Sequence, residues 1–205
     1  MNILIAVPTY ENITPDTFKS IYDLDIGEHW CDFEYVRGYD VATARNNIAQ
    51  LALDGKYDYV LMVDNDVVLP PDALLNLLED KKEVCLGYYA HRTYNNVYDG
   101  RQNVCKLGEF NYTWLYKISE LEVLRAKGIY KVQIHGGGMG CALIKTDIFK
   151  KIEYPWYDWV NYKDRHGLLS EDLYFCNECA KKEIPIFTDT RVGCGHLLRS
   201  VQWPI

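Results

Sequence analysis

The feature that most constrains the fold is a short apolar run, Tyr59–Val63 (YVLMV), which ends directly in the acidic triplet Asp64–Asp66 (DND). A short, continuous apolar run predicts a strand that is buried on both faces. Similar runs occur at Ile3–Val7 and Val84–Tyr88, and Phe33–Val36 is a further candidate strand. Several strands of this kind favour a sheet that is covered on both sides.

Helical segments are expected between these strands. Residues 42–53 carry apolar side chains at helical spacing, one helix follows Pro15, and the proline pair at 70–71 opens another helix over residues 72–80. The alternation predicts an α/β fold, with one Rossmann-like domain over residues 1–205, a mostly parallel central sheet and helices on both faces. A chain of 205 residues has room for one such core and little more.

The second half of the chain is less regular, and its residues 91–130 give no clear assignment. The expected elements after them are a glycine-rich loop, a strand and a helix capped by Thr146 within residues 135–149, a loop over 156–169, a helix over 171–183 capped by Ser170, and a short strand over 185–188.

Charge and hydropathy exclude several classes of protein. The net charge is −7, which argues against a broad phosphate-binding surface, so stable binding to nucleic acid or to an anionic membrane is not expected. There is no apolar run of 18 residues, and the N-terminal segment lacks the basic region and cleavage site of a signal peptide. We therefore expect a cytoplasmic protein whose seven cysteines are reduced.

The pair Cys176 and Cys179 has the spacing of half a zinc site. Cys194 or His196 would have to complete it. The favoured interpretation is that both cysteines lie on one side of a helix and pack as small apolar residues.

Asp64 and Asp66 are the strongest candidates for chemistry. In a parallel sheet, ligands bind at the carboxyl ends of the strands, where this triplet lies and where Pro8–Tyr10 follows the first strand. Carboxylate oxygens suit Mg²⁺ or Mn²⁺, and such a cation stabilises the charge that develops on a departing diphosphate. The alternative is a solvated turn, because Asp and Asn are common turn residues.

Three further features point to a site. Glu171 and Asp172 stand at a predicted helix start, where a carboxylate can act as a general base, although the helix dipole alone also favours acids there. His196, in a glycine-flanked turn, is either a metal ligand or a structural histidine. The run Gly136–Gly138 is not a phosphate-binding P-loop, but it permits close approach of a ligand or simply forms a hinge.

The order of these motifs along the chain is PTYEN, RNN in a helix, VDND, GGGMGCALI, SEDLYF and a late histidine. This order resembles the family 2-type glycosyltransferases of the GT-A fold, especially their small bacterial and phage members, over about residues 3–197. The resemblance implies a nucleotide-sugar-binding half (1–90) and an acceptor-binding and catalytic half (91–205). It also implies a nucleotide-sugar donor, with UDP favoured, and Mn²⁺ or Mg²⁺ as cofactor.

The resemblance implies a role for each matching residue. Nucleotide-sugar binding falls to Pro8, Thr9, Tyr10, Glu11, Arg45, Asp64, Asn65, Gly137, Gly138 and Met139. Metal binding falls to Asp64, Asp66 and His196, with Asp66 the more direct ligand, and base catalysis to Asp172 beside Glu171. The reaction expected from a base at Asp172 is a single displacement with inversion, although retaining enzymes of the same fold also use a DxD motif and a late histidine.

The sequence departs from the family pattern in two places. The family often has an acidic residue after its second strand, where this chain has Tyr35–Gly38, so the nucleobase preference is open. The QxxRW segment of processive polysaccharide synthases is absent. The acceptor is equally open, whether a glycan, a lipid carrier, a protein or a modified base in DNA.

Three other functions compete with this interpretation. A phosphohydrolase of the haloacid-dehalogenase type would use Asp64 as nucleophile, but that class usually has its DxD strand near the N-terminus and a Thr or Ser where this chain has Val68. A nucleotidyltransferase would carry a glycine-rich basic segment after the first strand. A sugar-binding module would not need the DxD motif, acid pair and histidine together.

Overall fold

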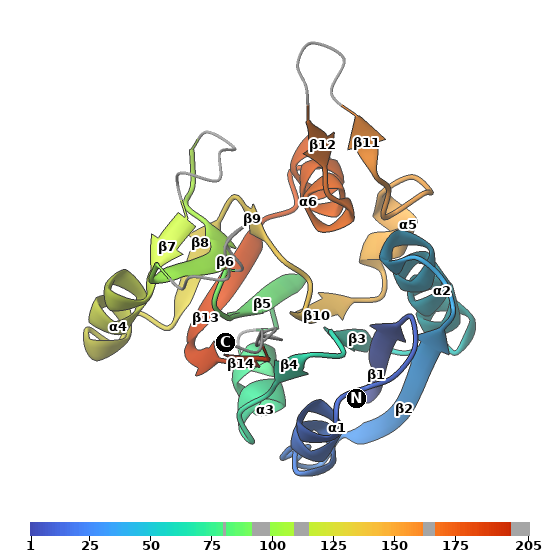
Figure 1. Ribbon diagram of the computed structural model, residues 1–205, viewed down its shortest axis with the longest axis horizontal. Helices are drawn as coiled ribbons and strands as arrows, with labels where there is room; N and C mark the ends of the chain where they lie inside the picture. Colours follow the sequence, from blue (N-terminus) through green and yellow to red (C-terminus); the bar gives the residue numbers. More distant parts are fainter. Residues whose placement is uncertain (80, 92–98, 109–114, 162–166, 198–205) are drawn as a thin grey trace, which may run out of the picture.

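The computed structural model describes residues 1–79, 81–91, 99–108, 115–161 and 167–197, and a seven-stranded sheet forms its centre (Figure 1). The strand order is β2-β1-β3-β10-β5-β13-β8. In chain order the strands are β1 (Asn2–Thr9), β2 (Trp30–Arg37), β3 (Tyr59–Val63), β5 (Val84–Tyr88), β8 (Lys131–Ile134), β10 (Cys141–Lys145) and β13 (Ile186–Gly193). All except β8 and β10 run in one direction, so the predicted mostly parallel sheet is confirmed.

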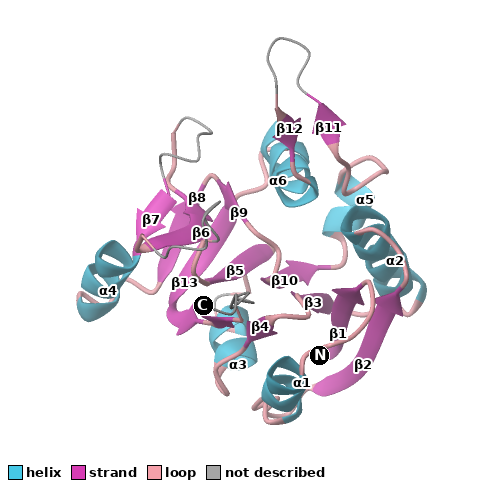
Figure 2. Cartoon of the chain, viewed as in Figure 1, coloured by secondary structure: helices cyan, strands magenta, loops and turns pink. Residues whose placement is uncertain are grey.

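Helices cover both faces of this sheet, also as predicted (Figure 2). One face carries α2 (Val41–Asp54), α5 (Ile148–Lys151) and α6 (Glu171–Lys181), and the other carries α1 (Pro15–Tyr22) and α3 (Ala73–Leu78). The start of α2 is fixed locally, because the carboxylate of Asp40 accepts hydrogen bonds from the backbone N–H groups of Ala42 and Thr43.

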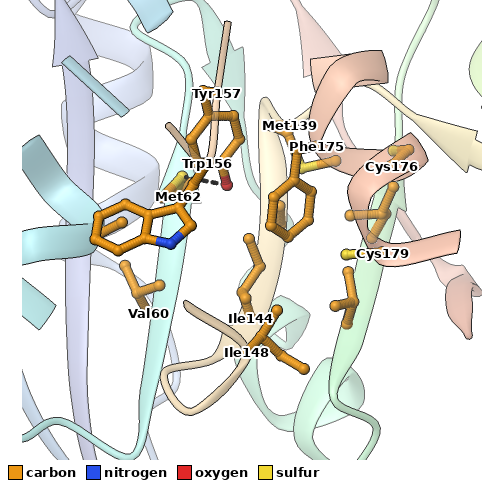
Figure 3. Packing of buried hydrophobic residues seen from close by; sticks show 14 of the residues in the cluster. Val60, Met62, Met139, Ile144, Ile148, Trp156, Tyr157, Phe175, Cys176 and Cys179 are labelled. Atoms are coloured by element: carbon orange, nitrogen blue, oxygen red, sulfur yellow. Dashed lines mark hydrogen bonds between the residues drawn. The ribbon is translucent and has the colours of Figure 1, made fainter. Parts of the chain in front are cut away.

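The core on the α6 side is built around aromatic and sulfur-containing residues (Figure 3). Tyr157 stacks on Phe175 with a centroid separation of 4.9 Å, and its hydroxyl lies 3.6 Å from the sulfur of Met62. Cys176 and Cys179 are buried in the same cluster, and burial raises the pKa of the Cys179 thiol to about 12. Both cysteines thus pack as apolar residues, as the favoured interpretation held.

Two smaller sheets and one hairpin flank the central sheet, and none of them was predicted. A three-stranded sheet joins β7 (Leu115–Lys117), β6 (Arg101–Cys105) and β9 (Gly136–Gly137), next to α4 (Ile118–Ala126). Strand β4 (Val67–Val68) pairs with β14 (Gly195–His196), and β11 (Val160–Asn161) pairs with β12 (Leu168–Leu169). These strands are mostly two or three residues long, too short to show a period.

Some predicted boundaries and caps are wrong. The residue at the start of α5 is Asp147, and Thr146 contributes only its carbonyl, which accepts a hydrogen bond from the N–H of Phe149. Ser170 does precede α6, but its hydroxyl donates to the carboxylate of Asp172 instead of capping a backbone N–H. Strand β13 continues to Gly193, well beyond the predicted end at 188.

Helices α3 and α6 end two residues before the predicted 80 and 183. The loop expected over 156–169 contains β11 and β12. Residue 80, residues 162–166 of that loop and part of the unassigned stretch 91–130 lie outside the described residues. None of the described helices has the length and apolar character needed to cross a membrane.

Candidate active site

The sheet topology brings the predicted motifs to one edge. Strands β1, β3 and β5 are co-directional, so Thr9, Asp64 and Tyr89 lie where these strands end. Strand β10 runs the opposite way, so its beginning, preceded by Gly140, reaches the same edge. Strand β13 is parallel to β5 and delivers His196 there. The convergence expected for a sheet of this type is confirmed.

Two hollows open at this edge and share one wall of carboxylates. The smaller has a volume of about 410 Å³ and the larger about 570 Å³. The shared residues are Asp64, Asp66, Glu171 and Asp172. The rest of the smaller hollow is lined by Pro8, Thr9, Tyr10, Tyr39, Asp40, Val41, Arg45 and Asn65. The larger is completed by Tyr89, Ala90, His91, Asn103, Cys105, Leu115, Gly138, Trp159, Ser170, Leu173 and His196.

Arg45 is the cation at the centre of this wall, and it is buried, with 2% of its surface exposed. Its guanidinium donates to Asp64 Oδ1 at 2.9 Å, to Glu171 Oε1 at 3.3 Å and to the carbonyl of Met139 at 3.3 Å. Arg45 therefore ties together the end of β3, the start of α6 and the segment before β10. These three bonds hold the shape of the wall.

The two acids at the start of α6 are held in different ways. Glu171 is buried and paired with Arg45, whereas Asp172 accepts hydrogen bonds from the Ser170 hydroxyl and from the N–H of Leu173. Burial raises the pKa of both carboxyl groups, and the nearby charge of Arg45 offsets this only in part. A carboxylate with a raised pKa is a stronger base, which suits proton abstraction from a hydroxyl.

Asp66 and His196 face each other across a gap. His196 Nδ1 lies 2.8 Å from the carbonyl oxygen of Ala90. A carbonyl only accepts, so Nδ1 carries a proton, and in the neutral imidazole Nε2 presents its lone pair. Nε2 lies 3.7 Å from Asp66 Oδ2, whereas two adjacent ligands of an octahedral Mg²⁺ are about 3 Å apart. A small closure would therefore let both atoms bind one divalent cation.

These two groups do not form a complete metal cage. Among the described residues, no three histidine, cysteine or acidic side chains are grouped closely enough to hold an ion by themselves. Mg²⁺ and Mn²⁺ commonly keep several positions for water and phosphate oxygens, so two protein ligands at an open cleft fit such an ion. The carboxylate of Asp64 instead accepts a hydrogen bond from Arg45, so the two aspartates of the motif face different partners.

The DxD loop and the first-strand segment are joined by Asn65. Its side-chain amide donates to Thr9 Oγ1 at 3.3 Å and to the carbonyl of Asn12 at 2.9 Å. Thr9 is buried by these contacts, whereas Tyr10 has 70% of its surface exposed at the mouth of the smaller hollow. Glu11 is exposed and is not part of the lining of that hollow.

An acidic residue does follow the second strand, although later than the sequence pattern suggested. Asp40 lines the smaller hollow together with Tyr39, three and two residues beyond the end of β2. A hydrogen bond from the Thr43 hydroxyl lowers the pKa of Asp40, so its carboxylate is ionised. The family pattern places this acid within Tyr35–Gly38, and in this chain it lies two residues later.

Of the predicted glycine segment, Gly138 is the residue that lines a hollow. A Cβ on Gly138 would lie 2.5 Å from the Tyr89 hydroxyl, and one on Gly140 would lie 2.7 Å from Asp64 Oδ2. Both positions must be glycine for Tyr89 and Asp64 to keep their places. Gly137 pairs with β6 in the β6–β9 sheet and Met139 is fully buried, so these two residues pack behind the hollows and do not line them.

Sequence reasoning missed Tyr89, Asn103 and Trp159. The Tyr89 hydroxyl accepts a hydrogen bond from the N–H of Gly140 at 3.0 Å, and its ring meets His196 edge-on at 5.1 Å. Burial, and then the charge of Asp64, raises the pKa of Tyr89. The signal that singled out Asp64, a polar residue directly after a buried strand, also applies to Tyr89 after β5.

Comparison with known proteins shows the fold. No protein-family model and no curated protein sequence matches the chain. Among solved structures, A197 from STIV is similar, with a TM-score of 0.65 and 17% identity over 97% of this chain and 87% of that one. GalNAc-T7, crystallised with UDP, GalNAc and Mn²⁺, is similar with a TM-score of 0.61 and 12% identity over 96% of this chain, which spans 44% of the length of that one. The likeness extends over nearly the whole chain, and together with the mixed α/β sheet it shows the GT-A-like fold that the motif order implied.

Proposed function

We propose that this protein is a metal-dependent glycosyltransferase that moves a sugar from a nucleotide-sugar donor to an acceptor hydroxyl. The observation that carries the proposal is the wall of four acids between two hollows. A transferase must hold two substrates on either side of its reacting groups, and this arrangement provides a compartment for each. The likeness to GalNAc-T7 with UDP and Mn²⁺ supports the same interpretation at the level of the fold.

The nucleoside belongs in the smaller hollow, which residues 1–90 largely line. Tyr10 and Tyr39 offer exposed aromatic faces for a base, and the Asp40 carboxylate is an acceptor for an imide N–H or a ribose hydroxyl. An acceptor at this position suits uracil, whose N3–H is a donor, and also guanine, whose N1–H is a donor, so the choice of a UDP-sugar is supported by the likeness to GalNAc-T7 with UDP. Residues 91–205 supply most of the other hollow, where the acceptor belongs.

Asp66 and His196 would hold Mn²⁺ or Mg²⁺, with Asp64 held nearby by Arg45. The cation would supply charge neutralisation for the departing nucleoside diphosphate. The protein's own contribution is to keep His196 in the tautomer that presents Nε2, through the Ala90 carbonyl, and to orient Asp66 through the loop that Asn65 fastens.

Asp172 is the proposed base. Its carboxylate lies on the wall shared by both hollows and takes the proton of the acceptor hydroxyl as that oxygen attacks the anomeric carbon. The bond between the anomeric carbon and the diphosphate oxygen breaks on the opposite face, so the product has inverted configuration. Ser170 and the N–H of Leu173 fix the orientation of the carboxylate.

Calorimetric titration with UDP and then GDP, each with and without Mn²⁺, tests the donor site. We expect UDP to bind only in the presence of the metal. Asp66→Ala should weaken this binding by about a hundredfold, in line with the loss of a metal ligand or its support. Asp54→Ala is the matched control, because Asp54 is an acid at the other end of α2 from Arg45.

Binding of UDP that does not need metal, or that survives Asp66→Ala, would overturn the metal site. Binding of neither nucleotide would overturn the donor site as a whole. In that case hydrolysis of phosphate esters should be assayed next, as a test of the haloacid-dehalogenase interpretation, in which Asp64 is the nucleophile. The hydrogen bond from Arg45 makes Asp64 less suitable for that role.

A further inference from the structure

The larger hollow carries information about the acceptor, because the described residues that line it include four acids and no lysine or arginine. Asp64, Asp66, Glu171 and Asp172 contribute four carboxyl groups. No lysine or arginine is among the described residues that line it, and the buried Arg45 opens to the other hollow. A phosphate-bearing ligand is normally held by Arg, Lys or a row of backbone N–H groups. Apart from the cation that Asp66 and His196 would hold for the donor diphosphate, the described lining offers the phosphate of an acceptor no lysine or arginine partner.

The remaining lining is apolar or neutral. Trp159 stands at the hollow with 42% of its surface exposed, whereas Leu115, Leu173 and Cys105 are buried in its wall. A tryptophan face with nearby amide and carboxylate acceptors suits a ligand that has an apolar ring face and hydroxyl groups around its rim. An extended lipid tail would need a longer apolar surface than this wall offers.

The segment that carries Trp159 is held by contacts to the site. The side chain of Asn46, next to Arg45 on α2, accepts hydrogen bonds from the N–H groups of Trp156 and Tyr157 and donates to the Tyr157 carbonyl at 2.8 Å. Tyr157 is further held by its stacking on Phe175 of α6. The segment that carries Trp159 is thus fastened to the two helices that supply Arg45 and Asp172.

We propose that the acceptor is an uncharged saccharide, bound in the larger hollow with one sugar ring on Trp159. The proposal rests on the proposed function and narrows its acceptor from four classes to one. In the step, a hydroxyl oxygen of the saccharide forms the new bond to the anomeric carbon of the donor. Its proton passes to Asp172, and the nucleoside diphosphate leaves with the electrons of the broken carbon–oxygen bond.

The experiment measures release of nucleoside diphosphate from a set of UDP-sugars in the presence of Mn²⁺ and one acceptor at a time. The acceptors are methyl glycosides and neutral disaccharides, the matched glucose 6-phosphate, a polyprenyl phosphate in detergent micelles, a serine-containing peptide, and an oligonucleotide with a hydroxymethylated base. We expect at least one neutral saccharide to stimulate release about tenfold or more over water, with little dependence on salt concentration. The phosphorylated acceptors should not stimulate it.

Substitution of Trp159 tests the platform. Trp159→Ala should raise the KM for the saccharide by about tenfold while the Kd for UDP with Mn²⁺ is unchanged, and Trp159→Phe should restore most of the loss. Trp30→Ala is the matched control, because Trp30 is an exposed tryptophan on β2, at the edge of the sheet. It should leave both constants unchanged.

The outcomes separate this inference from the function on which it rests. Donor consumption that only the lipid phosphate, the peptide or the oligonucleotide stimulates would overturn the saccharide acceptor and leave the transferase standing. If Trp159→Ala behaves like Trp30→Ala, the binding of a sugar ring on Trp159 is overturned. Metal-dependent UDP binding without consumption of any UDP-sugar would overturn the transferase and the acceptor together.

Discussion

Among the described residues, two charge clusters that contain buried members are balanced differently. The site cluster (Arg45, Asp64, Glu171 and Asp172) sets one cation against three carboxyl groups. The edge cluster (Glu79, Lys131, Asp189 and Arg191) lies between α3, β8 and β13 and sets two cations against two carboxyl groups. Figure 1 places β8 at the far end of the sheet from β1 and β2.

The pKa values show the consequence of this difference. Burial alone would raise the pKa of Asp189, but hydrogen bonds from Arg191 and Lys131 outweigh it and the pKa is lowered. At Asp172 burial also raises the pKa, and the hydrogen bond from Ser170 together with the charge of the single Arg45 does not outweigh it. The charges of the edge cluster are therefore balanced by partners within the fold. The site cluster keeps an excess of negative charge, which is typical of ligand-binding and catalytic sites.

The largest expected effect comes from Asp172→Asn. Loss of the base should lower the transfer rate by about 10²–10⁴-fold, while UDP binding persists. A carboxyl group whose pKa is raised by folding stabilises the folded state only at low pH, and that contribution is lost as the pH rises through its pKa. Its removal should therefore raise stability at neutral pH by about 1 kcal/mol, measured by urea unfolding.

Asp147→Asn provides the control for this substitution, because Asp147 is an exposed acid with an ion pair to Lys150. Full transfer activity in Asp172→Asn would eliminate Asp172 as the base. Lower stability of that variant at neutral pH would mean that the site cluster is balanced like the edge cluster.

Asp189→Asn should have the opposite pattern. Removing one partner of a buried ion pair costs about 3–5 kcal/mol of stability, and Lys131 and Arg191 would both lose their main partner. The activity per folded molecule should not change. Urea unfolding gives the stability. The transfer rate divided by the concentration of sites, which titration with UDP and Mn²⁺ counts, gives the activity per folded molecule.

Glu83→Gln is the matched comparison, because the pair of Glu83 with Lys151 is at the surface and should be worth less than about 1 kcal/mol. An equal loss of stability in Glu83→Gln and Asp189→Asn would contradict the structural role of the edge cluster.

Arg45→Gln is expected to have a smaller effect that depends on pH. The charge of Arg45 lowers the pKa of Glu171 and Asp172, so its loss should raise both pKa values further. The acidic limb of the pH–rate profile should then move to higher pH, and the rate at neutral pH should fall by up to about 10²-fold through misplacement of the wall. Arg45→Lys retains the charge and should keep the limb in place. An acidic limb that does not move in Arg45→Gln would show that Arg45 does not lower the pKa of the base.

The central strands could be predicted from the sequence because their signals are local. Tyr59–Val63 and Val84–Tyr88 are buried on both faces, so every residue in each run is apolar and both boundaries match the structure. Strand β13 was predicted too short, because its second half, Asp189–Gly193, carries the charged partners of the edge cluster. An Asp in a strand is predictable only when its partner, here Lys131 some 58 residues away, is known.

The site was predictable to the extent that it follows strand ends. The DxD motif and the acid pair come directly after or before a predicted element, whereas His196 was singled out by its glycine-flanked turn, eight residues beyond the predicted strand at 185–188. Trp159 and Asn103 follow no such rule: Trp159 comes two residues after Tyr157, in a segment that Asn46 holds through Trp156 and Tyr157, and Asn103 lies in the short strand RQNVC. The role of Arg45 as a buried tie required knowledge of three contacts distant in sequence.

The segment from Gly136 to Cys141 has a mechanical consequence. It leaves the β6–β9 sheet at Gly137, passes Tyr89 and Asp172 at Gly138, offers the Met139 carbonyl to Arg45 and enters the central sheet at Cys141. This segment thus reaches the larger hollow directly at Gly138 and the smaller one through Arg45. If an acceptor shifts this segment and thereby changes the affinity for the donor, the donor must change the affinity for the acceptor by the same factor, because linkage between two sites is reciprocal.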